Sequence, residues 1–111
     1  MNTGGLGLGD LMKLAGQAGK IRERMDQVQE RAARATVQGE AAGGLVKATA
    51  NGMGELLTVT VDPEVLKDPE DLGPLIVAAV NTAMRKSKET LREEFREALG
   101  GIDLPAGIPG F

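Results

Sequence analysis

Apolar residues between positions 10 and 35 recur at steps of three and four, the spacing that places side chains on one face of an α-helix. We call this stripe the apolar seam, and it comprises Leu11, Leu14, Ala18, Ile21, Met25, Val28, Ala32 and Ala35. Asp10 precedes it and is the expected N-cap, since a carboxylate there accepts unpaired amide hydrogens. The pattern predicts one long helix over residues 10–35 whose seam packs against another helix.

A second row of the same helix lies about 100° from the seam and contains no carboxylate. We call it the basic row, and it comprises Lys13, Gln17, Lys20, Arg24, Gln27 and Arg31. The acids Glu23, Asp26 and Glu30 lie on another side, so these cations have no acidic partner in their own helix. Such a row is either a solvated polar face or a surface that binds anions.

From residue 36 onward the pattern changes to alternation, which indicates strands. Three short segments have this character: 36–41 (TVQGEA), in which Gly39 is an interruption, 45–50 (LVKATA) and 55–61 (ELLTVTV). Gly43-Gly44 indicates the first turn. We expect a small three-stranded antiparallel sheet with one face left to cover.

The second turn carries the strongest hairpin signal, Asn51-Gly52, because both residues tolerate a positive φ. Met53 and Gly54 follow it and indicate a connection longer than two residues. In the third strand Leu57, Val59 and Val61 share one face, which we expect to be dry. The opposite face carries Leu56, Thr58 and Thr60.

A second long helix follows the sheet. Asp68 and Pro69 fit an N-cap and a first helical position, but Pro74 would clash with the preceding turn. We therefore expect the regular helix to begin near Gly73 and to end at about Leu99, before a pair of glycines. Its apolar face comprises Ile76, Val80, Ala83, Ser87, Leu91 and Ala98.

These elements predict an α+β fold of long helix, three-stranded antiparallel sheet and long helix. The predicted organisation is a flexible Gly-rich leader over 1–9, one domain over 10–99 and a flexible Gly/Pro-rich tail over 100–111. A chain of 111 residues with a long helix builds a small core, so a second copy is plausible. We expect the seam to pack on the last helix of the same subunit and the exposed sheet face to join two copies; a seam at the dimer interface is the alternative.

The composition excludes several chemistries. The chain has no cysteine and no histidine, which removes disulfides, thiolate ligands, imidazole ligands and imidazole bases. We therefore expect no enzyme, no cofactor, no metal and no small-molecule substrate. No apolar run reaches the roughly 20 residues that a membrane span needs, and residues 1–8 lack the features of a signal peptide. The expected compartment is the cytoplasm, without a membrane partner.

Charge is distributed unevenly along the chain, although the formal net charge is −3. Residues 10–35 hold six Lys or Arg against four acids, whereas residues 36–82 hold two Lys against seven acids. The cationic character therefore belongs to the helices, and the middle of the chain is acidic.

The amino-acid sequence of the central segments resembles that of the YbaB/EbfC family of bacterial nucleoid-associated proteins. The resemblance rests on Leu11-Met12-Lys13, Gly43-Gly44-Leu45-Val46-Lys47, Asn51-Gly52, Val61-Asp62-Pro63 with Leu66, and residues 76–81 (IVAAVN) with Ala83. It implies a cytoplasmic, nucleoid-associated homodimer joined through its sheets, with helices projecting as a pair of arms. It also implies that the protein binds and compacts double-stranded DNA and contributes to nucleoid organisation and gene regulation.

In that family the first and last helices are held to contact DNA, which points to the cations of both helices here. The candidate DNA-binding residues are Lys13, Lys20, Arg24, Arg31, Arg34, Arg85, Lys86 and Lys88. On the last helix Glu89 and Glu93 lie beside the cations, so an exposed face of ion pairs is an equal alternative.

The two aromatic residues, Phe95 and Phe111, provide almost no base-stacking platform, and no helix-turn-helix or zinc module is recognisable. We therefore expect recognition through phosphate charge and duplex shape. The competing hypothesis is a dimeric helical adaptor that binds another protein and not DNA.

Overall fold

The computed structural model describes residues 7–100, which form two long helices and a small sheet. In chain order these are α1 (Leu8–Arg34), β1 (Thr36–Ala41), β2 (Val46–Asn51), β3 (Leu56–Val61) and α2 (Pro69–Ala98). A short 3₁₀ turn, η1 (Ala42–Gly44), joins β1 to β2, and a second, η2 (Pro63–Lys67), joins β3 to α2. The predicted α+β order of helix, three strands and helix is confirmed.

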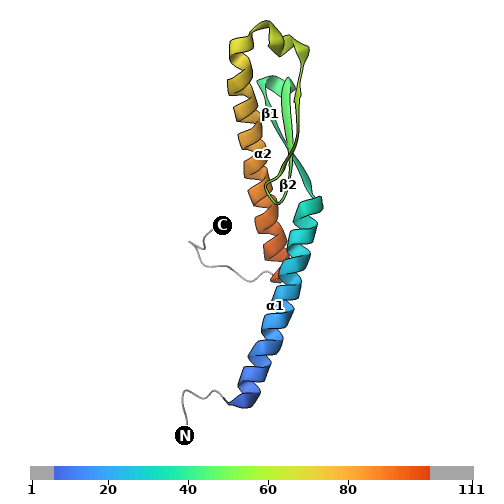
Figure 1. Ribbon diagram of the computed structural model, residues 1–111, viewed down its shortest axis with the longest axis vertical. Coiled ribbons are helices and arrows are strands. Elements are labelled where there is room, and N and C mark those ends of the chain that lie inside the picture. The colour runs from blue at the N-terminus through green and yellow to red at the C-terminus, as the bar shows by residue number, and fades with distance from the viewer. Residues whose placement is uncertain (1–6, 101–111) are drawn as a thin grey trace.

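The sheet is antiparallel, with the strand order β1-β2-β3, and α2 lies across one face of it (Figure 1). The core between them consists mainly of small apolar side chains: Val46, Ala48 and Ala50 from β2, Ala79 and Ala83 from α2, and Val65 from η2. The smallest spacing is at Gly39 of β1, where a Cβ would collide with the Ala79 carbonyl and the Ala83 amide. Gly39 therefore does not interrupt the strand; it lets α2 approach the sheet closely.

The α1 helix begins at Leu8, earlier than the pattern predicted, and the prediction of Asp10 as N-cap is wrong. Gly7 is the N-cap, and the Asp10 carboxylate, three residues into the helix, accepts the Gly7 amide at 3.3 Å. An acid at this position still complements the positive end of the helix dipole. Residues 1–6 of the predicted leader and 101–111 of the predicted tail lie outside the described residues.

The α2 helix begins at Pro69, not near Gly73, with Asp68 at the N-cap as predicted. Pro74 lies inside it. The proline removes only the one hydrogen bond that its missing N–H would give to Glu70, and this occurs next to the first turn, where most amides lack helical partners anyway. The helix therefore continues through Pro74. A proline within the first two turns disrupts a helix less than one in its middle, and for this reason the predicted start near Gly73 is wrong.

The connection between β2 and β3 is longer than two residues, as predicted, but its predicted conformation is wrong. Neither Asn51 nor Gly52 has a positive φ; in this turn only Gly54 does, at 80°. The Asn51 side chain instead accepts the amides of Met53 and Glu55 at 2.9 and 3.1 Å. Gly52 donates its amide to Ala32 of α1 at 2.7 Å, so this turn fastens the sheet to the end of α1.

The β2 strand begins one residue later than predicted because the turn before it includes Ala42, Gly43 and Gly44, all with positive φ. A register shift between Thr49 and Ala50 pairs Leu56 with Ala50. The expectation of a dry face on β3 is wrong for a single chain, since Leu57 is 51% exposed and Val59 is 39% exposed. The physical reason is that α2 lies mainly over β1 and β2, which leaves the β3 side open.

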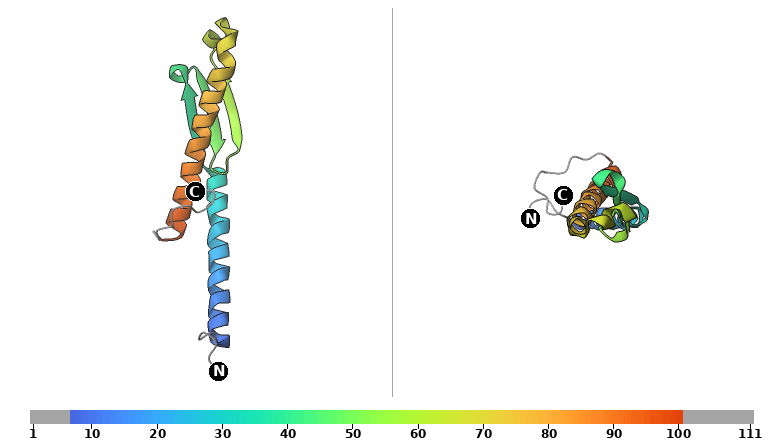
Figure 2. Two further views of the ribbon diagram at one scale, coloured as in Figure 1. Left: turned by 90° about the vertical axis from the view of Figure 1, so that its left-hand side faces the viewer. Right: turned by 90° about the horizontal axis from the view of Figure 1, so that it is seen from above.

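The apolar seam of α1 packs on α2 within the chain only over its C-terminal half. Val28 and Ala32 are buried there, whereas Leu11, Leu14 and Ile21 are each about half exposed. Figure 2 shows the reason: α1 runs well past the end of α2. Residues 8–24 are exposed throughout and are called the α1 extension below.

Candidate nucleic-acid interface

The basic row begins on the α1 extension with Lys13 and Lys20, seven residues or about 10 Å apart along the helix axis. Both side chains are exposed. Within residues 7–100 neither makes an ion pair or a side-chain hydrogen bond. A phosphate approaching this part of α1 would therefore meet two cations without competing carboxylate partners.

Farther along the row the cations contact α2, which the sequence did not predict. The Arg24 guanidinium donates from Nη1 to the carbonyl of Ala98 at 3.4 Å, at the C-terminal end of α2. Arg31 Nη1 lies 3.9 Å from Glu94 Oε2. A cation at the C-terminus of a helix complements its dipole, so Arg24 stabilises the crossing of the two helices. The basic row itself contains no acid, but α2 places Glu94 beside Arg31.

Arg34, the flanking candidate, is paired with Glu30 one turn earlier at 3.0 Å. Both side chains are largely exposed, and such pairs contribute only about 0.3–0.5 kcal/mol. The pair therefore exchanges readily for a phosphate.

Of the three candidates on α2, two have hydrogen-bond partners and one has none among the described residues. Lys86 donates from Nζ to the carbonyl of Gln38 on the edge strand β1 at 2.8 Å, and Arg85 donates to the Thr82 hydroxyl at 3.1 Å. Lys88 is exposed and has no ion pair or side-chain hydrogen bond within residues 7–100. The ion pair that the sequence suggested for this helix forms farther on, between Arg96 and Glu93 at 3.0 Å.

One chain does not gather all eight candidates into a single site. Arg31 and Glu94 pair where α1 crosses α2, and Arg24 contacts the end of α2. Lys13 and Lys20 lie beyond that crossing, and Lys86 lies beside β1. The elongated molecule, 78 × 25 × 19 Å, thus carries its cations along its length instead of in one pocket.

Glu94 is a residue of the candidate interface that the sequence pattern did not indicate. Its Oε2 atom is buried and has no hydrogen-bond partner among residues 7–100, and the ion pair with Arg31 at 3.9 Å is its interaction across the helix crossing. A carboxylate beside the basic row opposes a bound phosphate. The predicted packing of the two helices was the one signal that could have brought this acid into the site.

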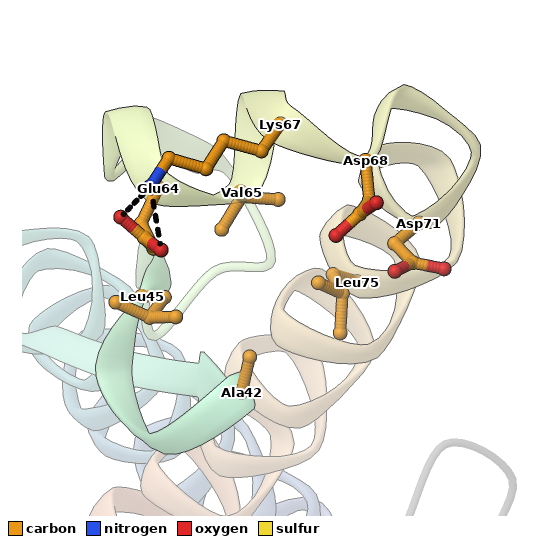
Figure 3. Close-up of a pocket in the computed structure, with 8 residues that line it drawn as sticks. All are labelled: Ala42, Leu45, Glu64, Val65, Lys67, Asp68, Asp71 and Leu75. Carbon is orange, nitrogen blue, oxygen red and sulfur yellow. Dashed lines mark hydrogen bonds and ion pairs between the residues drawn. The ribbon is translucent and has the colours of Figure 1, made fainter.

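The opposite end of the molecule is acidic. A hollow of about 250 Å³ lies there. Figure 3 shows the Asp68 and Asp71 carboxylates on one side of it, with the apolar side chains of Leu45 and Val65 among its other lining residues. Lys67 contacts Glu64 at 3.1 Å and so adds no free cation. This end repels phosphate, which limits the candidate interface to the helices.

In the described part of the chain no group of three potential ligand side chains could hold a metal ion. No helix of residues 7–100 is long and apolar enough to cross a membrane. Neither observation adds a functional residue to the candidate interface.

Curated relatives are similar over nearly the whole chain. A nucleoid-associated protein of Chlorobium phaeobacteroides (strain DSM 266) is 41% identical over 101 residues, which cover 91% of this chain and 88% of the relative. The corresponding protein of Chlorobium chlorochromatii is 43% identical with the same coverage. That of Nocardia farcinica is 40% identical over 105 residues, covering 92% of this chain and 94% of the relative.

The fold also has a counterpart among solved structures. The crystal structure of an uncharacterized protein from Helicobacter pylori superposes with a TM-score of 0.68, covering 86% of this chain and 99% of that one at 24% identity. The model of the YbaB/EbfC DNA-binding family matches residues 7–102. The resemblance seen in the sequence is confirmed: the chain belongs to the YbaB/EbfC DNA-binding family, which is not an enzyme family.

Proposed function

We propose that this protein is a homodimeric, nucleoid-associated protein of the bacterial cytoplasm that binds double-stranded DNA through the basic faces of its helices. In this role it contributes to nucleoid organisation and gene regulation. The observation that supports the proposal best is the position of Lys13 and Lys20. In a member of a DNA-binding family, both project from a fully exposed stretch of helix without ion-pair partners among the described residues.

The electrostatics of the α1 extension support a phosphate contact. It carries four basic side chains against two acidic ones, in a chain whose net charge is −3. Its length of about 24 Å is comparable to the width of a DNA duplex, so its exposed cations can lie along a groove or a phosphate backbone. Such contacts carry little sequence information and favour binding by charge and shape.

The second copy has a candidate surface beside β3. Thr82 and Lys86 lie on the β1 side of α2, close to Gly39 and Gln38, so the opposite side of α2 faces β3. There the chain exposes an apolar group that we call the β3 flank: Leu56, Leu57, Val59 and Val77, which are 39–57% exposed. An apolar cluster of this kind at a sheet edge favours association.

Dimerisation over the β3 flank supports the binding mode. An isologous interface gives the dimer two equivalent α1 extensions and two copies of every candidate cation. Two weak phosphate-binding edges on one particle then bind one duplex with an effective concentration advantage. The role of the eight candidate residues and the pairing of two copies are thus parts of one proposal.

The experiment is a titration of a labelled 30-base-pair duplex with the purified protein at about 50 mM salt, beside the single strand of the same sequence. Light scattering gives the mass of the protein under the same conditions. We expect a dimer that retards the duplex more strongly than the single strand. A dimer that leaves the duplex unbound would contradict DNA binding and favour the adaptor hypothesis, for which the exposed seam of the α1 extension is the supporting observation.

A further inference from the structure

The apolar seam is covered only as far as α2 extends. Val28 and Ala32 are 1% and 0% exposed, whereas Leu11, Leu14 and Ile21 on the same seam are 53%, 52% and 51% exposed. The change occurs near Arg24, which contacts the last residue of α2. Three large apolar side chains in a row on an exposed helix are a surface that lacks its partner.

The C-terminal end of α2 lies beside this uncovered half. Leu99 and Gly100 donate their amides to Phe95 and Glu97 at 3.0 and 3.1 Å, and Gly100 has a φ of 67°. This is a common glycine ending of a helix, which turns the chain out of the helical path. Figures 1 and 2 show α2 ending beside α1, so Gly100 lies near the boundary between the covered and the uncovered halves of the seam.

We propose that residues 101–111 pack along the uncovered half of the seam in the same chain, running from the level of Arg24 toward Leu8. This segment carries the apolar residues Ile102, Leu104, Ile108 and Phe111 and no Lys or Arg. Its eleven residues reach about 36 Å when extended, and the α1 extension is about 24 Å long. The segment is therefore long enough to reach every exposed residue of the seam.

Two further features fit this occupant. A hollow of about 200 Å³ lies at the start of the path, lined by Gln17, Lys20, Ile21 and Arg24. Pro105 and Pro109 lack amide hydrogens, which lowers the number of backbone donors that would lose water when the segment packs on a helix.

A second copy fits the seam less well. In an antiparallel isologous pair of seams the same flank of each helix meets its own copy. The basic rows would then lie together, with Lys13, Lys20 and Arg24 of both chains along one side, and like charges at that spacing repel. A tethered segment without cations avoids this repulsion, and its effective concentration is in the millimolar range.

In the hollow at the start of the path, the segment would touch the near edge of the basic row at Gln17, Lys20 and Arg24, whereas Lys13 is not part of the hollow's lining. The segment would also stiffen a stretch of helix that contains Gly16 and Gly19, both without any neighbour that a Cβ would meet. The inference does not depend on the proposed function.

The test uses the absence of cysteine from the chain, so that only introduced thiols react. The full chain with Ile21→Cys and Leu104→Cys is oxidised beside the control Glu23→Cys with Leu104→Cys, in which the first thiol lies on the opposite side of α1. We expect an intrachain disulfide in the Ile21 pair at least about ten times faster than in the Glu23 pair, at a rate independent of protein concentration. Equal rates in the two pairs would overturn the proposal. Disulfides formed mainly between chains, detected by mixing with a longer tagged chain, would overturn it as well.

Hydrogen exchange provides a second measurement that needs no cross-link. In the variant Ile108→Ser/Phe111→Ser, amides of residues 12–22 should exchange about tenfold faster than in the parent, while amides of β2 keep their rates. Ala106→Ser is the matched control and should leave all rates unchanged. Unchanged exchange in residues 12–22 of the double variant would overturn the proposal.

Discussion

Arg31 Nη1 lies 3.9 Å from Glu94 Oε2, where α1 crosses α2, and in the described part of the chain that buried carboxylate oxygen has no hydrogen-bond partner. Arg31 itself is 61% exposed, so its charge is available to solvent on one side and opposed by Glu94 on the other. The pair places an acid at the edge of the basic row. Because this carboxylate repels phosphate, we expect the basic row to bind DNA more weakly than it would without Glu94.

Neutralising that acid should strengthen DNA binding. For Glu94→Gln we expect the affinity for duplex DNA to rise about threefold at roughly 50 mM salt and the difference to shrink at higher salt, because the removed repulsion is electrostatic. The free energy of unfolding should change by less than about 1 kcal/mol, since Arg31 is largely exposed. Fluorescence anisotropy and urea denaturation provide the two values.

Glu93→Gln is the matched control, because Glu93 pairs with Arg96 on α2 and not with the basic row. It removes the same charge and should leave the affinity for DNA nearly unchanged. An equal gain in both variants would show that net charge, and not the position of Glu94, determines the effect.

The close approach at Gly39 should make this position intolerant of any side chain. Gly39→Ala places a Cβ against the Ala79 carbonyl and the Ala83 amide, so α2 must move away from β1. We expect a loss of about 2 kcal/mol or more in the free energy of unfolding, measured by chemical denaturation. A variant as stable as the parent would mean that the helix is not seated on this glycine.

The reverse result is expected at Gly16, which lies in an exposed part of α1 with open space around it. Gly16→Ala should raise the stability of the helix by about 0.5–1 kcal/mol, because alanine loses less backbone entropy on folding. The measurement is the helical signal in circular dichroism as a function of temperature. A lower helical content in this variant would indicate that a neighbour contacts Gly16 in solution.

Leu57 belongs to the β3 flank and is 51% exposed, so a charge there should act on the dimer before it acts on the fold. Leu57→Asp should convert the dimer to a folded monomer in light scattering, with circular dichroism close to that of the parent. Met12→Asp on the α1 extension is the control and should remain dimeric. Retention of the dimer by Leu57→Asp would place the interface elsewhere.

Substitutions of two neighbouring lysines of α2 should have different effects, one on stability and the other on DNA affinity. Lys86 donates to the Gln38 carbonyl at 2.8 Å, so Lys86→Gln should lower the free energy of unfolding by about 0.5–1.5 kcal/mol. Lys88 makes no such contact within residues 7–100, so Lys88→Gln should leave stability unchanged and reduce only the affinity for DNA. The opposite assignment, with Lys88 the residue that matters for stability, would contradict the observed contacts.

The order of the elements could be predicted because each has a strong local signal. The seam of α1 has a helical period over 26 residues, and the strands alternate between clear turn residues. The roles of Gly39 and Gly52 could not be predicted, since each depends on a contact with a distant helix, at Ala79 and Ala32 respectively. Pro74 was misjudged for a similar reason: the cost of one lost hydrogen bond is outweighed by packing over the rest of α2.

The candidate interface was predictable to a lesser degree. The pattern places Lys13 and Lys20 on one face of α1, and the structure leaves them without partners in residues 7–100. It could not reveal that Arg24 contacts the end of α2 or that Arg31 faces Glu94, because these contacts depend on how two helices separated by the whole sheet cross. Helical periodicity fixes the face of a residue but not what the fold places opposite that face.

The central claim is that the exposed cations of the α1 extension bind DNA, and charge reversal at matched positions tests it most directly. Lys13→Glu/Lys20→Glu is compared with Lys47→Glu/Lys67→Glu, which changes the net charge equally on β2 and η2, near the acidic end of the molecule. With duplex binding followed by anisotropy from about 50 to 200 mM salt, we expect the first variant to lose at least tenfold in affinity and to show a shallower salt dependence. The second should bind nearly as well as the parent. Equal losses in the two variants, or none in the first, would contradict the account.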